Sequence, residues 1–160
     1  MTVFLCDALL YLSTGVLYWW WSGHLSVFGV SPNFIFLGVL SIAVLASPGR
    51  AIAYGFLSGI YMDLLGVDLF GGYALTYSLL AYGIYLMKRH FEVASPVPQA
   101  VTALAMSLAC MLFYLALSLV LAKVNPLSPK TFFVEPFFNA AAAPVVFHIF
   151  SRLKRKFGIL

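Results

Sequence analysis

The 160-residue chain is 63% hydrophobic and 9% charged, and its formal net charge is +4 at pH 7. A soluble domain carries about 25% charged residues, so this composition excludes a water-soluble fold and predicts an all-α integral membrane protein. The positive charge does not indicate nucleic-acid binding, because the basic residues lie at the ends of apolar segments, where they mark membrane topology.

Glycine, proline and charged residues divide the chain into six apolar segments, each a candidate transmembrane helix. The second and third are short for a bilayer, and the helix of the second is expected to start near Pro32 or as early as Leu25. Five spans with one broken helix are the alternative. The chain has no linker or repeat, which predicts a single domain over 1–160. The six segments cover about residues 4–21, 32–47, 50–66, 71–88, 97–122 and 132–151.

The first segment, residues 4–21, ends in an aromatic cluster, Tyr18–Trp21, which is typical of an anchor at the membrane interface. It has no basic start and no small-residue cleavage site, so it predicts a retained span and not a signal peptide. Asp7 lies one turn into this segment and is expected to pair with Lys88 or Arg89 across the interface.

The segment at 50–66 carries two glycines one turn apart, Gly55 and Gly59, and Asp63 continues the same helical face. The pair predicts close packing with another helix of the chain, with homodimerisation as the second interpretation. An ionised aspartate in hydrocarbon costs roughly 2.5–3.5 kcal/mol, so Asp63 needs compensation. It is expected to hydrogen-bond the next loop or to cap the helix that begins at Gly71–Gly72. The alternatives are an ion or ligand site and a contact for a partner's helix.

The polar residues inside the apolar segments form no recognisable catalytic set, which predicts a protein without enzymatic activity, metal or cofactor. His24 and His148 have no partner at the spacing of a metal site or catalytic triad. Cys6 and Cys110 lie in apolar segments and are expected to be small buried hydrophobic residues. Tyrosines of two adjacent segments serve either as interface belts and interhelical hydrogen bonds or as the lining of a ligand pocket: Tyr54, Tyr61, Tyr73, Tyr77, Tyr82 and Tyr85.

Lysine and arginine give an independent test of the six-span division. One predicted side, with both termini, carries seven of them, and the other carries two, Lys123 and Lys130. The basic side faces the cytoplasm, so both termini are predicted to be cytoplasmic. The last four of the seven form a basic tail, which is expected to bind anionic lipid headgroups or, as the alternative, a cytoplasmic partner. The seven are Arg50, Lys88, Arg89, Arg152, Lys154, Arg155 and Lys156.

Residues 55–82 contain a glycine-rich helix ending in Asp-Leu-Leu, a short loop with glycine, and an apolar helix with Ala-Tyr. The residues of this pattern are Gly55, Gly59, Asp63-Leu64-Leu65-Gly66, Gly71-Gly72, Ala74-Leu75, Tyr77 and Ala81-Tyr82. The pattern resembles the rod shape-determining protein MreD family. Length, span number and terminus orientation fit over the whole chain, and Asp7 and the Trp19–Trp21 cluster depart from the pattern. Two further pieces also fit, Ser31-Pro32-Asn33 and Asn139 with Pro144.

The resemblance implies a component of the cell-wall elongation machinery in the bacterial cytoplasmic (inner) membrane. It implies an architecture similar to the substrate-binding subunits of energy-coupling-factor transporters. It also implies binding to the bitopic protein MreC, and through it to the RodA glycosyltransferase, a penicillin-binding transpeptidase and the actin-like MreB.

We therefore expect a non-enzymatic scaffold that holds a partner's transmembrane helix. The alternative function is a vitamin-binding subunit of an energy-coupling-factor transporter. The Ala-x-x-x-Ala pair typical of that class is missing from Ala8-Leu9-Leu10-Tyr11-Leu12. A small lipid-carrier transporter is the third possibility, and it would require a polar path that the segments do not offer. The residues expected to bind the partner or to support the fold are Gly55, Gly59, Asp63, Gly66, Gly71 and Gly72.

Overall fold

The computed structural model describes the backbone of residues 2–24, 26, 29–66, 69–88, 93, 95–121 and 128–157, and side chains within these ranges except 2–11, 22 and 157. Every regular element in these residues is a helix, as the sequence predicts, and each of the six predicted segments corresponds to one helix. The helices are α1 (Thr2–His24), α2 (Phe34–Leu45), α3 (Pro48–Leu65), α4 (Gly72–Met87), α5 (Pro96–Val120) and α6 (Pro129–Phe157).

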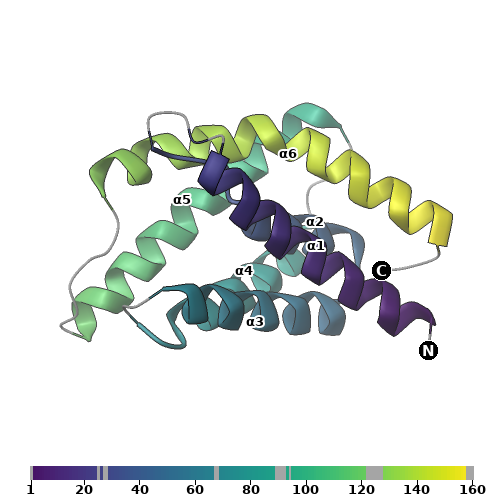
Figure 1. Ribbon diagram of the computed structural model, residues 1–160, viewed down its shortest axis with the longest axis horizontal. Coiled ribbons are helices and arrows are strands. Elements are labelled where there is room, and N and C mark those ends of the chain that lie inside the picture. Colours follow the sequence, from purple (N-terminus) through teal and green to yellow (C-terminus); the bar gives the residue numbers. More distant parts are fainter. Residues whose placement is uncertain are drawn as a thin grey trace.

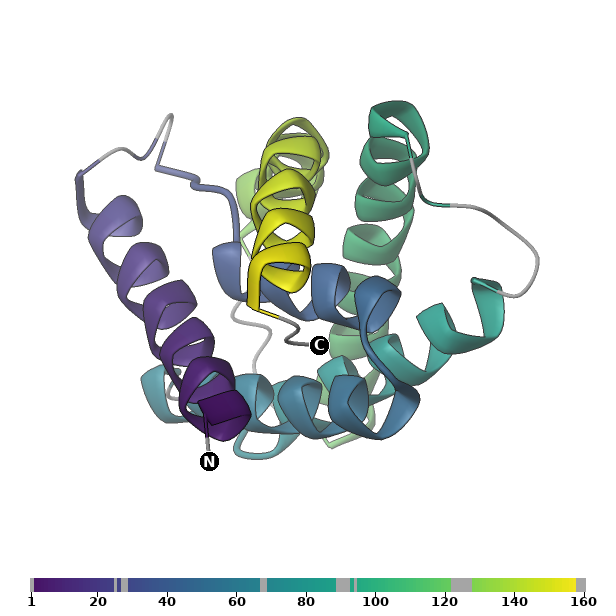
Figure 2. The same cartoon turned by 90° about the vertical axis from the view of Figure 1, so that its right-hand side faces the viewer.

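Two pairs of helices enclose the short helix α2. The pair α3–α4 forms one side of the molecule and the pair α5–α6 the other, with α2 between them (Figure 1). A quarter turn of the view shows α2 between α6 and α3, with α1 leaning against the bundle (Figure 2). The start of α1 and the end of α6 lie at the same end of the molecule. This arrangement places both ends of α2 against side chains from other helices.

The six helices differ widely in length, from the 12 residues of α2 to the 29 residues of α6. Among the described residues, the helices at Pro96–Val120 and Pro129–Lys156 are long and apolar enough to cross a membrane. By contrast, α2 has 12 residues and is about 18 Å long, well short of a hydrocarbon core of about 30 Å. It is nevertheless the most enclosed element, because it contacts all five other helices and nine of its residues are buried. The hydrophobic core is centred on α2.

The start of α2 differs from one of the two predicted positions. The helix begins at Phe34, and Asn33 is its N-cap, whose side chain accepts a hydrogen bond from the Phe36 amide at 3.0 Å. A start near Leu25 is wrong, because residues 29–33 are not helical. Pro32 has no amide hydrogen and disfavours helical backbone at the residue before it, so the helix starts after the proline.

The C-terminal end of α2 is capped by lysines from two other helices. The Lys88 ammonium, at the end of α4, donates to the carbonyl oxygens of Ala43 at 3.3 Å and Ala46 at 2.9 Å. Lys154, in the last turn of α6, donates to the carbonyl oxygen of Leu45. The last carbonyls of a helix have no partner within the helix and carry partial negative charge, so two cations stabilise this end.

These contacts change the interpretation of two predicted groups. Lys88 caps α2. The side chain of Asp7 and all of Arg89 lie outside the described residues, so the pairing of Asp7 stays a prediction. In the basic tail, Arg152, Arg155 and Lys156 are exposed, whereas Lys154 binds α2. The expectation that all four cations of the tail are directed to lipid is therefore wrong for Lys154.

Replacement of Lys154 by methionine should destabilise the fold, because the carbonyl end of α2 loses a charged donor. We expect a loss of about 1–3 kcal/mol, measured by thermal unfolding in detergent. Arg155→Met is the matched control, since Arg155 is the next residue and is exposed. Equal melting temperatures for the two variants would contradict the capping role.

Candidate functional site

Asp63 caps α4 from the neighbouring helix. Its side chain is 6% exposed, and its two oxygens accept hydrogen bonds from the backbone amides of Tyr73 at 2.9 Å and Ala74 at 3.1 Å. The N-cap of α4 is Gly71, which has no side chain to satisfy these amides. A carboxylate at a helix N-terminus is also favoured by the helix dipole. The arrangement therefore matches the expected capping of the helix that begins at Gly71–Gly72.

The two glycines before Asp63 allow the backbones of α3 and α4 to touch. A Cβ atom added to Gly55 would lie 2.6 Å from the carbonyl oxygen of Tyr77, and one added to Gly59 would lie 2.3 Å from Cα of Ala74. Both distances are too short for any side chain. The glycine-bearing face of α3 is thus filled by α4 of the same chain. It cannot also hold a partner's helix, which corrects the predicted location of that contact.

The remaining predicted glycines lie in or beside the turn from α3 to α4. Gly71 has a φ of +92°, a conformation that favours glycine. A Cβ atom on Gly72 would lie 2.8 Å from the ring of Tyr114 on α5. Gly66 ends α3 with an ordinary φ of −88°, and its backbone imposes no requirement for glycine. These residues shape the junction of three helices and bring no chemical group to a site.

A second polar cluster joins the start of α2 to α4, α5 and α6. The backbone amide of Asn33 donates to Oδ1 of Asn139 at 2.7 Å, and the side-chain amide of Asn33 donates to the Tyr77 hydroxyl at 3.2 Å. Asn139 in turn donates to the hydroxyl of Ser107 at 2.9 Å. Asn139 is fully buried. Buried amides of this kind are costly unless they are paired, so the cluster fixes the relative positions of four helices.

A partly open cavity of about 160 Å³ lies beside this cluster. Glu135 of α6 lines it and interacts with the side-chain amides of Asn139 and Asn33. A more polar space of about 240 Å³ adjoins it and shares Tyr18, Thr131 and Glu135 with it. The cavity is the principal candidate site among the described residues, and its walls are Tyr18, Asn33, Phe36, Met62, Tyr73, Thr76, Tyr77, Ser107, Cys110, Met111, Tyr114, Thr131 and Glu135.

The six tyrosines that the sequence singled out are divided among several roles. Tyr73 and Tyr77 line the cavity. Tyr54 shares a hydrogen bond of 3.0 Å with Thr14. The ring of Tyr61 packs close to the position that a Cβ atom on Gly15 would occupy. Tyr82 is exposed, and the Lys88 ammonium lies 5.7 Å from the ring centre of Tyr85. The pocket interpretation thus applies to two of the six, together with Tyr18 and Tyr114, which sequence reasoning did not include.

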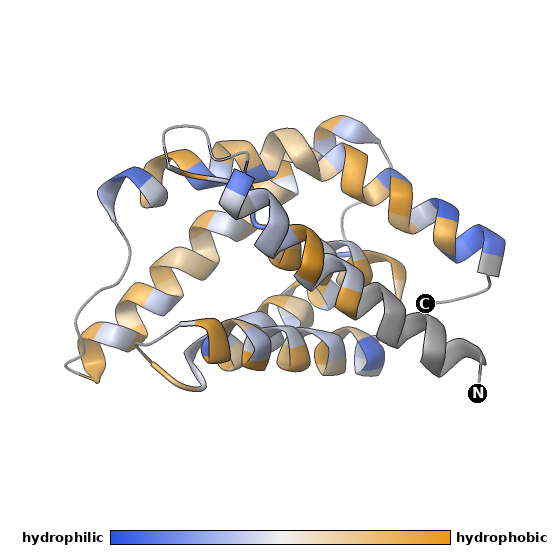
Figure 3. Ribbon diagram, viewed as in Figure 1, coloured by the Kyte–Doolittle hydropathy of each residue, from blue (hydrophilic) through white to orange (hydrophobic). Residues whose placement is uncertain are grey.

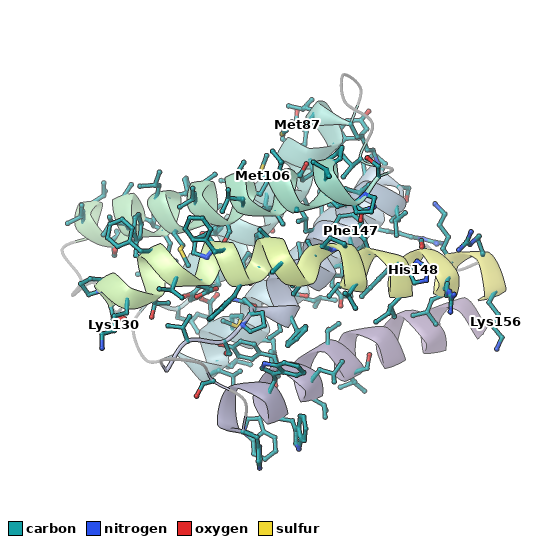
Figure 4. The ribbon with its side chains drawn as sticks, turned by 90° about the horizontal axis from the view of Figure 1, so that it is seen from above. Met87, Met106, Lys130, Phe147, His148 and Lys156 are labelled. Atoms are coloured by element: carbon teal, nitrogen blue, oxygen red, sulfur yellow. The ribbon has the colours of Figure 1, made fainter. Side chains whose placement is uncertain are left out.

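The histidines and cysteines contribute little to this site. Nδ1 of His24 donates a hydrogen bond to the carbonyl oxygen of Trp20 at 2.9 Å, and the imidazole ring stacks on the indole of that tryptophan. His148 is exposed near the end of α6 (Figure 4). Cys110 is a free thiol in the cavity wall, and the side chain of Cys6 lies outside the described residues. The described residues contain no group of three or more side chains that could hold a metal ion.

Glu135 is the important residue that sequence reasoning missed. It stands within Phe132-Phe133-Val134-Glu135-Pro136-Phe137, an apolar stretch in which an acid is as costly as Asp63 is on α3. The free-energy cost of a carboxylate in this apolar stretch could have identified Glu135 as a candidate functional residue. The amide partners Asn33 and Asn139 are 106 residues apart, so their pairing could not be foreseen from spacing.

The outer surface of the helices is strongly apolar. Hydrophobic residues cover α5 and most of α6, whereas the last turn of α6 is hydrophilic (Figure 3). Figure 4 shows α6 lying over the bundle, with Lys130 at one end and Lys156 at the other. Along α6, exposed residues recur every four positions and form an apolar ridge, made by Phe133, Phe137, Ala141, Val145 and Ile149.

An all-helical bundle with inward polar groups and an apolar exterior defines the class of helical membrane proteins. A comparison with protein families matches residues 1–157 to the rod shape-determining protein MreD. The chain belongs to this family, as the residues around Asp63 predict, and is therefore a membrane protein of the rod-shape machinery. Comparisons with curated proteins and with solved structures give no match, so the likeness to energy-coupling-factor subunits stays a prediction.

Gly59→Ala should destabilise the protein by about 1–3 kcal/mol, because the new methyl group meets the backbone of α4. Gly83→Ala on α4 is the matched control, since a Cβ there has nothing within 4 Å. That control should be neutral or stabilising by up to about 1 kcal/mol, as alanine favours helix. Thermal unfolding of both variants checks the contact, and an unchanged Gly59→Ala protein would contradict it.

Asn139→Leu should also cost about 1–3 kcal/mol, because it leaves the Asn33 amide and the Ser107 hydroxyl without their partner. Phe137→Leu provides a comparison on the same helix at a side chain that is 66% exposed, and it should change stability by less than about 0.5 kcal/mol. Chemical or thermal unfolding in the same detergent measures both. A smaller effect at Asn139 than at Phe137 would show that the cluster does not hold the helices together.

Proposed function

We propose that the chain is a non-enzymatic scaffold of the cell-wall elongation machinery, which binds an MreC-like bitopic protein through a transmembrane helix face. The match of residues 1–157 to the rod shape-determining protein MreD is the observation that carries this proposal. The geometry supports it, because Asp63, Asn33, Asn139, Lys88 and their partners hold helices together. Through MreC the scaffold would act on RodA, the transpeptidase and MreB.

The proposed topology has six membrane segments and cytoplasmic termini in the bacterial inner membrane. Its support is the common position of the start of α1 and the end of α6, where Lys88 and Lys154 meet the end of α2. The exposed cations of the last turn of α6 lie at this same end. In this topology the short helix α2 is shielded from lipid by its neighbours.

The apolar ridge of α6 is the surface that we propose for the partner's helix. The glycine face of α3 is occupied by α4, so a partner requires another surface. The ridge runs along α6 from Phe133 to Ile149, and Ala141 at its centre is a small residue that permits close helix approach. The partner's single helix would then lie across α6 on the exterior of the bundle.

The vitamin-binding alternative is less well supported. Ligand pockets for molecules of that size usually have volumes of about 300–1,000 Å³. The cavity has about 160 Å³, and tyrosine and methionine side chains line it. The cavity therefore favours a much smaller ligand than a vitamin.

Ala141→Trp should reduce co-purification of the MreC-like partner about tenfold, because the indole blocks close approach at the centre of the ridge. Leu57→Trp is the matched control, since Leu57 is 53% exposed on the outer side of α3. The measurement is partner capture from membranes at equal expression, with melting temperatures to establish folding. Full capture by a folded Ala141→Trp protein, or equal loss with Leu57→Trp, would exclude α6 as the specific interface.

A further inference from the structure

Glu135 is a carboxylate with no cationic partner among the described residues. It borders both the cavity of about 160 Å³ and the adjoining polar space of about 240 Å³. The side chains that interact with it are the amides of Asn139 and Asn33. Lys130, on the same helix, is exposed. The scaffold function described above makes no use of this group.

The amide oxygens beside Glu135 are already engaged in hydrogen bonds. Oδ1 of Asn33 accepts from the Phe36 amide at 3.0 Å, and Oδ1 of Asn139 accepts from the Asn33 amide at 2.7 Å. Their remaining groups are N–H donors, which orient the carboxylate. Ca²⁺ and Mg²⁺ require about six or more oxygen ligands, so this arrangement is poorly suited to a metal ion.

The walls of the cavity are aromatic. Tyr18, Tyr73, Tyr77 and Tyr114 all line it. The rings of Tyr73 and Tyr114 are stacked with centres 4.4 Å apart, and Tyr77 meets Tyr73 edge-on at 5.8 Å. Aromatic rings around a carboxylate are the recognition chemistry of organic ammonium groups, which combine cation–π attraction with a charged contact.

The volume limits what can enter. A protein cavity of roughly 150 Å³ accommodates a molecule the size of benzene, and this one has about 160 Å³. An ammonium headgroup of a few heavy atoms fits within that space. The adjoining space is also lined by Ser26, Gly29, Val30 and Ser31, and Glu135 lines both spaces.

We propose that this cavity binds an organic ammonium group, with Glu135 as its counter-ion and the four tyrosines as its walls. The ligand is a soluble amine or the amino headgroup of a phospholipid, and both sources present the same chemistry. The site is separate from the α6 ridge, because none of the residues that line the cavity belongs to the ridge. The inference does not depend on the scaffold function.

Ligand-induced stabilisation of the purified protein tests the proposal. Choline or ethanolamine chloride should raise the melting temperature over sodium chloride at equal ionic strength, whereas the uncharged carbon analogue of choline should not. Glu135→Gln keeps the shape of the side chain and should weaken binding at least about tenfold. Lys130→Gln, on the same helix but exposed, should bind normally.

A second experiment, in lipid nanodiscs, distinguishes a soluble amine from the amino headgroup of a phospholipid. If the headgroup fills the site, soluble amines should act on protein in phosphatidylglycerol nanodiscs and lose their effect in phosphatidylethanolamine nanodiscs. If the ligand is soluble, both bilayers should give the same response. Tyr73→Leu is measured alongside Glu135→Gln, so that a folded variant of the site remains for the test if the other variant unfolds.

The proposal is overturned by equal protection from the uncharged analogue, by protection from no ammonium compound, or by unchanged binding in folded Glu135→Gln and Tyr73→Leu proteins. Each of these results leaves the capture of a partner by α6 unaffected. Failure of α6 to capture the partner would likewise not affect the proposal of an ammonium site.

Discussion

The fold depends on satisfying the two ends of one short buried helix. A helix that contacts all others and spans only about 18 Å leaves amides at one end and carbonyls at the other inside the bundle. Asn33 and Asn139 serve the first end, and Lys88 and Lys154 serve the second. Lys88 comes from the end of α4, and Asn139 and Lys154 come from α6. The position of α2 therefore depends on the positions of these two helices, and theirs depend on α2.

The junction of α3 and α4 solves the same problem by a different route. Gly71 turns the chain and cannot cap α4, so Asp63 reaches across from α3 to bind the free amides. Gly55 and Gly59 bring the two backbones close enough for that reach. The family pattern of glycines and aspartate is thus a packing motif within this chain. The helix of a binding partner would therefore need an outer surface, such as the ridge that we propose on α6.

The cavity adds a property that a simple scaffold does not require. Its carboxylate, aromatic walls and modest volume are at one end of the same asparagine cluster that holds α2. Residues of all six helices line the cavity, so a ligand bound there would contact all of them together. Occupancy of the cavity would then add to the contacts that hold the bundle closed.

The sequence by itself determined the class of protein, the six helices, the family and the capping role open to Asp63. These follow from local composition and from spacings of three or four residues, which a helix converts directly into neighbours. Only the tertiary structure decided that Lys154 binds α2, that α4 covers the glycine face, and that Glu135 meets Asn33 and Asn139. Those contacts join residues up to 109 positions apart, and no local pattern records which buried polar group will find which partner.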